Sequence, residues 1–257
     1  MSVYIFSLPK AGTYFFSSLL EKLGFHDTGF HISGSSYLDT KAHSLSVNAK
    51  TPGRAKVEKF FVPVIRSLGE KDVAAGHFPL PLNFKIAGRN GRYLCAYRDP
   101  MRTLVSEFID FRFRREDVAW ISKTEIVDDR VAFCAYLLRH GVKAHLNIFR
   151  NIALLRMIEQ SPLCPDELRN TMYFVNFDHA LIDPKVTAGI AAFLGVVLSE
   201  DDARARLQSA LDAETKTKAT GIAVDRDALW TDEARKIYEA SEFPAIKALA
   251  VHHTLSF

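Results

Sequence analysis

A short apolar strand, a glycine-containing loop and an amphipathic helix follow one another without interruption at the start of the chain. Residues 3–8 are largely apolar and have the length of a buried strand, and the loop of residues 8–13 follows directly. Apolar side chains then recur at helical spacing: Phe15, Phe16, Leu19, Leu20 and Leu23. This layout is typical of a phosphate-binding cradle, because the first N–H groups of a helix have no acceptors within the helix and attract anions.

The loop contains three residues that suit an anion. Gly12 can adopt backbone angles that are closed to other residues, so the chain can turn tightly around a ligand. Lys10 adds a full positive charge, and Thr13 either caps the helix or donates its hydroxyl to a phosphate oxygen. The loop is not a Walker A motif, because its lysine precedes the glycine. The loop alone therefore leaves an ordinary strand–turn–helix with a surface lysine as an alternative.

A second segment repeats the strand-to-helix pattern. Residues 92–97 have the character of a buried strand that ends in Arg98-Asp99-Pro100, and the helix that follows carries Ser106. Arg98 is therefore expected at the carboxyl end of a strand, where α/β sheets present their binding residues. Further strands are predicted at 73–77 and 172–177, and helices at 57–68, 130–160, 204–211 and 232–240. This alternation predicts a mainly parallel sheet covered by helices on both faces.

At these residues the chain resembles the sulfotransferases that use 3'-phosphoadenosine 5'-phosphosulfate (PAPS). Their first signature is Pro-Lys-Ser-Gly-Thr-Thr-Trp, and residues 9–15 here are Pro-Lys-Ala-Gly-Thr-Tyr-Phe. Their second signature is a strand ending in Arg-Asp/Asn-Pro with a serine at a fixed distance, matched by Arg98 and Ser106. Residues 76–79 (Gly-His-Phe-Pro) stand where many members have His-Leu-Pro, and residues 175–195 resemble a later stretch of the family.

The resemblance implies one sulfotransferase domain over residues 1–257, with a P-loop-NTPase-like three-layer α/β fold and a central mainly parallel sheet. The implied reaction moves a sulfuryl group from PAPS to a hydroxyl acceptor by in-line displacement, without a metal, and releases adenosine 3',5'-bisphosphate (PAP). Lys10 and the N–H groups of residues 11–13 would face the leaving group, and His77, near its ordinary pKa of about 6.5, would take the acceptor proton. Arg98 and Ser106 would hold the 3'-phosphate. The implied donor-binding residues are Lys10, Ala11, Gly12, Thr13, Tyr14, Phe15, Arg98 and Ser106, with Lys216 and Lys218 as loose substitutes for a late Arg-Lys-Gly motif.

Several positions depart from the family pattern. Ala11 replaces a serine, Tyr14 stands where threonine or asparagine is common, and Phe15 replaces a tryptophan but keeps an aromatic face. Ala75 stands where many cytosolic members carry a lysine, and Phe177 lacks the hydroxyl of the related tyrosine. Two alternatives therefore remain: a nucleotide kinase or NTPase on a similar scaffold, and a nucleotide-binding module without turnover.

Composition limits the partners. A hydrophobic content of 48% over 257 residues is enough for one α/β core, and a net charge of +3 suits an anionic donor but not a nucleic-acid binder. Cys95, Cys134 and Cys164 are widely spaced among apolar neighbours, which favours a reducing compartment over a disulfide framework or a zinc site. No secretory signal or membrane span is visible, so a cytoplasmic protein is expected. The expected partner is a small-molecule or glycan hydroxyl acceptor, and a homodimer is left open.

Four further features receive structural interpretations. The polar segment 26–56 is interpreted as an irregular connection that covers the donor site and shapes the acceptor pocket. His140 and His145 do not share a face of a regular helix and are interpreted as satisfied or exposed side chains, and His252-His253 as a solvated tail. Residues 108–115 mix aromatic and basic side chains, either as a buried stripe with a basic edge or as a grip on an anionic acceptor.

Overall fold

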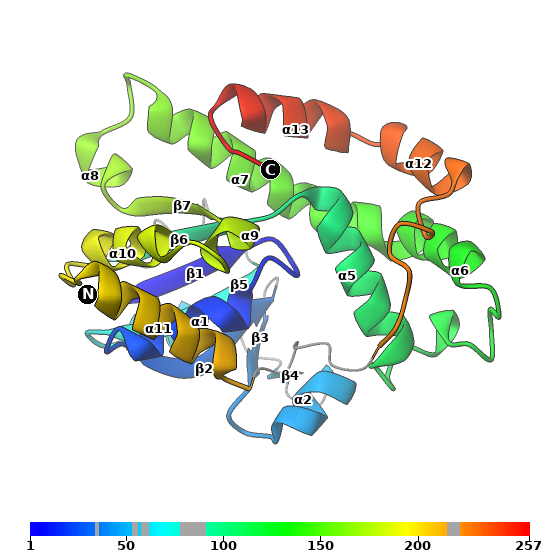
Figure 1. Ribbon diagram of the computed structural model, residues 1–257, viewed down its shortest axis with the longest axis horizontal. Helices are drawn as coiled ribbons and strands as arrows, with labels where there is room; N and C mark the ends of the chain where they lie inside the picture. Colours follow the sequence, from blue (N-terminus) through cyan, green and yellow to red (C-terminus); the bar gives the residue numbers. More distant parts are fainter. Residues whose placement is uncertain (34–35, 53–55, 58–61, 78–90, 215–221) are drawn as a thin grey trace.

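The computed structural model describes residues 1–33, 36–52, 56–57, 62–77, 91–214 and 222–257. In this part of the chain, seven strands form one sheet in the order β4-β3-β2-β5-β1-β6-β7 (Figure 1). The strands are β1 Val3–Ser7, β2 His26–Ser33, β3 Ser36–Asp39, β4 Lys56–Val57, β5 Asp72–His77, β6 Arg92–Tyr97 and β7 Met172–Asn176. The neighbouring pairs β2–β5, β5–β1, β1–β6 and β6–β7 are parallel, whereas β2–β3 and β3–β4 are antiparallel. The predicted mainly parallel sheet is therefore confirmed.

Helices cover both faces of this sheet and give a three-layer architecture (Figure 1). One apolar cluster joins the sheet to α1, α10 and α11, and a second cluster joins it to α5, α7 and α13. The helical elements are α1 Thr13–Lys22, α2 Leu45–Lys50, α3 Val62–Ser67, α5 Pro100–Phe113, η3 Ala119–Ile121, α6 Asp129–Tyr136, η4 Leu137–Gly141, α7 Val142–Gln160, α8 Asp166–Arg169, α9 Phe177–Ala180, α10 Pro184–Phe193, α11 Glu200–Asp212, α12 Asp232–Glu239 and α13 Phe243–His252. The α/β fold class expected from the sequence is confirmed.

Strand β1 shows why the sheet needs helices on both faces. All five of its residues are buried. Val3 and Ile5 pack toward α1, while Tyr4 and Phe6 pack toward α5 and α7, because successive side chains of a strand point to opposite faces. A continuous apolar run of this kind is typical of a central parallel strand. The strand therefore fixes where the loop of the cradle begins.

The prediction of an irregular connection over residues 26–56 is wrong. This segment contains β2, β3 and α2, and it ends at β4. β2 pairs with β5 and, through an irregularity between Asp27 and His31, continues to Ser33 beside His77. Polar side chains support the strands here, since the Thr28 hydroxyl donates to the Val73 carbonyl at 2.7 Å. These strands were not recognised in the sequence because they are only partly buried and therefore carry polar side chains instead of a clear apolar pattern.

The prediction of a solvated tail is right for the exposure of His252 but wrong for the C-terminal segment as a whole, which packs against the protein. His252 ends α13, and the Nδ1 atom of His253 lies 3.0 Å from Oε1 of Gln160. Phe257 then packs edge-on against Tyr97 and Phe149 in the core, with ring centroids 5.4 and 5.8 Å away. The chain end therefore closes the apolar layer formed by α7 and α13.

Candidate active site

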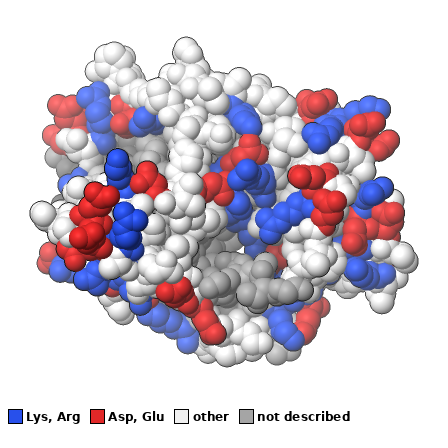
Figure 2. Space-filling view, in the orientation of Figure 1, with Lys and Arg blue, Asp and Glu red and all other residues white. Residues whose placement is uncertain are grey.

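A cavity of about 380 Å³ opens at the carboxyl edge of the parallel strands. β1 leads into its wall through Lys10, β5 ends at His77, and Arg98 and Phe177 follow β6 and β7. Helix α5 contributes Ser106 and other side chains to the opposite wall. Figure 2 shows this face of the molecule, where Lys and Arg side chains, with some Asp and Glu, border the hollow in its middle. The cavity therefore lies where an α/β sheet is expected to bind a ligand.

The cradle starts helix α1 without a side-chain cap. Gly12 is the N-cap residue, with a φ of 83°, and because it has no side chain it makes no side-chain cap bond to the first N–H groups of the helix. Thr13 does not cap the helix; its hydroxyl lies 2.6 Å from the Ser7 hydroxyl. The N–H of Ala11 donates to the Leu8 carbonyl at 3.0 Å. The expectation that the N–H groups of residues 11–13 all face the leaving group is therefore wrong for Ala11, because the turn uses that donor.

Gly12 also permits a close contact that holds the cradle against the next strand end. A Cβ atom at Gly12 would lie 2.1 Å from Cδ2 of Phe177, so only glycine fits. Phe177 in turn lies against Phe15, with ring centroids 5.8 Å apart, and under the Arg98 guanidinium at 5.2 Å. Phe15 and Ala11 are buried and do not line the cavity, whereas Lys10, Gly12, Thr13 and Tyr14 do.

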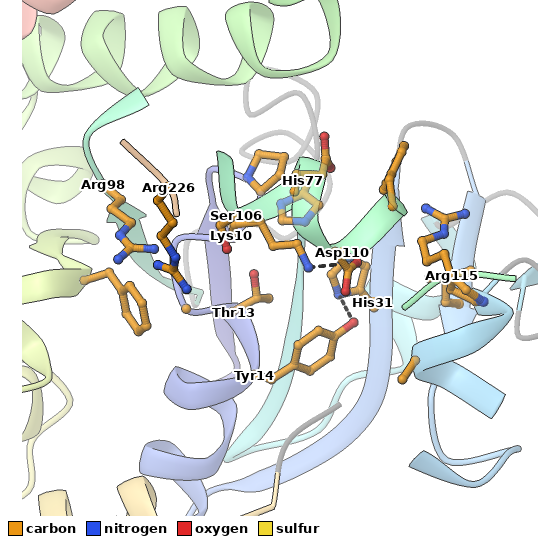
Figure 3. A pocket seen from close by; sticks show the side chains of 18 residues that line it. Lys10, Thr13, Tyr14, His31, His77, Arg98, Ser106, Asp110, Arg115 and Arg226 are labelled. Carbon is orange, nitrogen blue, oxygen red and sulfur yellow. Dashed lines mark hydrogen bonds and ion pairs between the residues drawn. The ribbon is translucent and has the colours of Figure 1, made fainter. Parts of the chain in front are cut away.

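Lys10 faces the cavity from a strained backbone position. Its φ is 63°, in the region that non-glycine residues rarely adopt. Its Nζ lies 2.9 Å from Oδ2 of Asp110, and the two side chains are only 13% and 15% exposed (Figure 3). Asp110 also binds Arg114 at 2.7 Å. Lys10 is thus held by α5, and an anion in the cradle would compete with Asp110 for it.

His77 is oriented by the end of β1. Its Nδ1 lies 2.7 Å from the Ser7 carbonyl oxygen, which can only accept, so Nδ1 carries the proton and Nε2 has the lone pair. Burial lowers the pKa of His77 to about 4, although the Ser7 carbonyl and the Glu107 charge act in the opposite direction. The expected pKa near 6.5 is therefore wrong. The ring is neutral at pH 7, and Nε2 is a proton acceptor.

The opposite end of the cavity carries the cations expected to bind the donor. Arg98 binds Asp178 through two of its nitrogens, with Nη2 2.8 Å from Oδ1 and Nε 3.0 Å from Oδ1. These bonds hold the pKa of Asp178 below its ordinary value, against the effect of burial. Ser106 lines the same cavity, as expected. Lys216, Lys218 and the Phe78-Pro79 stretch lie outside the described residues.

Sequence reasoning missed Arg226. This side chain lines the cavity, and Figure 3 places it at the same end as Arg98 and Thr13. It has no acidic partner within the described ranges. The side chain of Asp225 accepts bonds from the N–H groups of Asp227 and Ala228 at 3.1 Å and so forms the turn that carries Arg226. No local signal marks this arginine, because only the folded chain brings residue 226 to the cradle.

Sequence reasoning also missed His31. β2 places His31 beside Ala75 of β5, and the rings of His31 and His77 meet edge-on with centroids 4.9 Å apart. The Tyr14 hydroxyl lies 3.1 Å from Nδ1 of His31 (Figure 3). Burial raises the pKa of Tyr14, so its hydroxyl stays protonated. The missed strand explains the missed histidine, since only the pairing with β5 brings His31 to the cavity.

His140 and His145 meet at a single carboxylate. His145 Nε2 lies 2.8 Å and His140 Nε2 3.4 Å from Oε2 of Glu107, which lines the cavity. The expectation that they occupy different faces is wrong, because η4 is a π-helical turn and its wider winding aligns residues five positions apart. Such turns are frequent at functional sites.

The aromatic and basic stretch 108–115 is mainly structural. Phe108 is fully buried in the core, and Arg112 is buried with its guanidinium on Asp129 and on the carbonyl of Ile121. Arg115 does line the cavity, but both of its bonded nitrogens pair with Asp117. The stretch therefore anchors α5, as the structural interpretation expected, while Asp110, Phe111 and Arg115 also line the cavity.

Three general properties complete the description. No group of His, Cys, Asp or Glu in the residues described here has the arrangement of a metal site. None of the described helices combines the length and apolar character that crossing a membrane requires. The three cysteines are free, and burial raises the pKa of Cys95.

No protein-family model and no curated protein matches this chain. Solved structures do match over nearly its whole length. Retinol dehydratase with androsterone and the inactive cofactor PAP is 17% identical, with a TM-score of 0.61 over 100% of this chain and 82% of that one. Mouse sulfotransferase SULT7A1 with PAP is 13% identical, with a TM-score of 0.59 over 98% of this chain and 87% of its own. Retinol dehydratase with retinol and PAP gives 15% identity and a TM-score of 0.58, over 100% and 83% of the two chains. The chain therefore has the α/β fold of these PAP-bound structures, and its resemblance to the PAPS-dependent sulfotransferases holds at the level of the fold.

Proposed function

We propose that this protein is a sulfotransferase that moves a sulfuryl group from PAPS to a hydroxyl acceptor. The observation that carries the proposal is one cavity that combines an uncapped helix N-terminus, Lys10 and His77 with Arg98 and Ser106. Sulfuryl transfer requires positive charge at the leaving group, a proton acceptor at the nucleophile and fixed positions for both. The fold shared with PAP-bound structures supports the same reaction class.

In this proposal, the donor lies between the cradle and the Arg98 end of the cavity. Lys10 and the N–H groups at the start of α1 stabilise the negative charge that grows on the bridging oxygen. Arg98 and Ser106 hold the 3'-phosphate, and Arg226 adds a cation that no described carboxylate neutralises. Asp178 keeps the Arg98 fork in one orientation, so the phosphate meets a prearranged donor.

The acceptor hydroxyl lies on the His77 side. Its oxygen forms the new bond to sulfur while the bond between sulfur and the bridging phosphate oxygen breaks, and its proton passes to Nε2 of His77. The bonded Ser7 carbonyl keeps the ring in the tautomer that this step needs. The anionic donor would raise the low pKa of His77, because negative charge favours the protonated ring. Donor binding thus prepares the base.

Two of the solved structures described above, both of retinol dehydratase, hold androsterone or retinol, and a small-molecule alcohol is accordingly the proposed acceptor class. A glycan hydroxyl would accept the sulfuryl group by the same reaction. A cytoplasmic location, which the three free cysteines favour, is part of the proposal.

Thermal unfolding with PAP tests the proposal before any acceptor is known. At a PAP concentration about 100 times its Kd, the native state should gain about 2.7 kcal/mol, which for a chain of this size raises Tm by about 5–10 °C. Lys10→Met should reduce this shift, while the exposed Lys143→Met serves as the matched control. A larger shift with ATP and Mg²⁺ than with PAP would favour the kinase alternative. Strong PAP binding without transfer of labelled sulfate to any hydroxyl compound would favour a binding module.

A further inference from the structure

Glu107 differs from the other charged groups on the acceptor side of the cavity. Asp110 is neutralised by Lys10 and Arg114, and Arg115 by Asp117. Glu107 has no Lys or Arg within ion-pair distance in the described part of the chain. Its partners are two histidines and a tyrosine. The acceptor side therefore holds one carboxylate that no permanent cation balances.

All three partners of Glu107 bind the same oxygen. The Tyr136 hydroxyl lies 2.6 Å, His145 Nε2 2.8 Å and His140 Nε2 3.4 Å from Oε2. No bond within the described residues uses Oε1. The side chain is only 12% exposed, and it lines the cavity. One oxygen thus anchors the carboxylate, and the other is left for a ligand.

The anchoring cluster keeps Glu107 ionised. Although burial favours the neutral acid, the His145 charge and the bonds from His140, His145 and Tyr136 hold the pKa of Glu107 well below its ordinary value. The π-helical turn η4 is what allows both histidines to reach it. A buried carboxylate is costly to maintain, so a cluster built to keep one ionised beside a cavity points to recognition of a ligand.

Glu107 lies on the same cavity as His77, and its charge acts on that ring. An acceptor whose hydroxyl meets Nε2 of His77 therefore occupies the same cavity that Glu107 lines. Resting on the sulfotransferase function proposed above, we propose that Glu107 is the acceptor-recognition residue and selects hydroxyl compounds that carry a protonated amine.

A cation fits this position better than a neutral hydroxyl. Hydrogen bonds between an ammonium and a carboxylate are roughly twice as strong as neutral ones. The donor adds further negative charge to the cavity when it binds, and an ammonium group gains from that charge as well. We therefore expect the amine to raise kcat/KM by about tenfold or more over the same compound without it.

Matched acceptor pairs test this inference with PAPS carrying labelled sulfate. The pairs are tyramine with 4-ethylphenol, glucosamine with glucose and 3-aminopropan-1-ol with butan-1-ol. The wild-type protein should sulfate the amine-bearing member of at least one pair about ten times faster, and N-acetyltyramine should lose the advantage of tyramine. Glu107→Gln should reduce the ratio within that pair to about two or less without changing the PAP-induced Tm shift. Glu116→Gln, which removes an exposed carboxylate paired with Lys50, is the control and should keep the ratio.

Equal rates within every pair, or a Glu107→Gln protein that keeps the preference, would overturn the inference. N-acetyltyramine provides the same test on the unaltered protein if Glu107→Gln does not fold. PAP stabilisation with transfer only to neutral members, or to none of these compounds, would also reject the amine class while leaving the donor site intact. Absence of PAP stabilisation would reject the proposed function itself.

Discussion

The two ends of the cavity are built in different ways. The proposed donor end consists largely of chain segments that leave strands, namely the cradle with Lys10 after β1, Arg98 after β6 and Phe177 after β7. The proposed acceptor end is assembled, apart from His77 at the end of β5, from groups with no common motif, among them His31 in β2 and Glu107 in α5. A nucleotide site can thus be encoded in short strand-to-helix motifs, whereas the site for its partner depends on distant elements meeting.

The two ends also differ in charge. The donor end presents Arg98 and Arg226, while the acceptor end presents Glu107 and Asp110. The Lys10–Asp110 ion pair joins them, since each residue belongs to a different end. Variants that change turnover without changing PAP binding, or the reverse, would support this division. Variants that change both would contradict it.

The largest effect is expected at the acceptor end. His77→Ala removes the proton acceptor and should lower kcat by about 10²–10⁴-fold. PAP affinity should remain within about twofold, because the ring lies outside the donor end. Turnover measured against PAP binding separates the two effects, and the exposed His179→Ala is the control. Turnover close to the wild type would show that another group takes the proton.

Lys10→Met should lower turnover by about 10²-fold, because it removes a charge at the leaving group while keeping most of the side-chain volume. Initial rates at saturating acceptor measure this loss. If Lys10→Met weakens PAP binding but turns over normally at saturating PAPS, Lys10 contributes to donor binding and not to the chemical step.

Arg98→Ala tests the donor end. Loss of a charge-assisted bond should weaken PAP by about 10- to 150-fold, while AMP, which has no 3'-phosphate, should bind almost unchanged. Ser106→Ala should have a smaller effect, and the double variant less than the sum because both residues hold one group. Asp178→Asn separates recognition from support of the fold. If Arg98 only supports the fold through its ion pair with Asp178, both Arg98→Ala and Asp178→Asn should weaken AMP binding as much as PAP binding.

The low pKa of His77 predicts a specific pH dependence. A base must be unprotonated, so activity is lost as pH falls through its pKa. Because that pKa is about 4 in the free protein, the ring should remain neutral at pH 6, which NMR titration of the imidazole can measure. PAP should raise the titration midpoint, and kcat/KM should fall about tenfold per pH unit only below that midpoint. A midpoint near 6.5 without ligand would mean that the ring is open to water.

The smallest effect concerns the link between the two ends. Asp110→Asn removes the carboxylate that holds Lys10 and should tighten PAP by about three- to tenfold. Calorimetry at low and high salt can measure this, since the gain should shrink as salt screens the charge. Asp166→Asn, which breaks the exposed pair with Arg169, is the control and should have no effect. Weaker PAP binding in Asp110→Asn would show that Asp110 positions Lys10 for the donor.

The amino-acid sequence by itself determined the parallel strands β1, β5, β6 and β7 and the proposed donor end apart from Arg226. β1, the cradle and α1 are adjacent in the chain, so their apolar patterns, Gly12 and Lys10 specify them locally. The same holds for β6, Arg98 and α5. In each case a strand feeds directly into a helix, and the residues between them must lie at the carboxyl edge of the sheet.

Apart from His77, only the tertiary structure decided the proposed acceptor end. Polar strands such as β2 gain their backbone bonds from β5, which no local pattern predicts, and His31 reaches the cavity only through that pairing. The π-helical turn brings His140 and His145 to Glu107 because the helices around it pack that way. Burial, which depends on every neighbouring element, lowers the pKa of His77 far from the value of a free imidazole. Short motifs specify where a backbone turns, but the charge and protonation of a side chain depend on what the whole fold places around it.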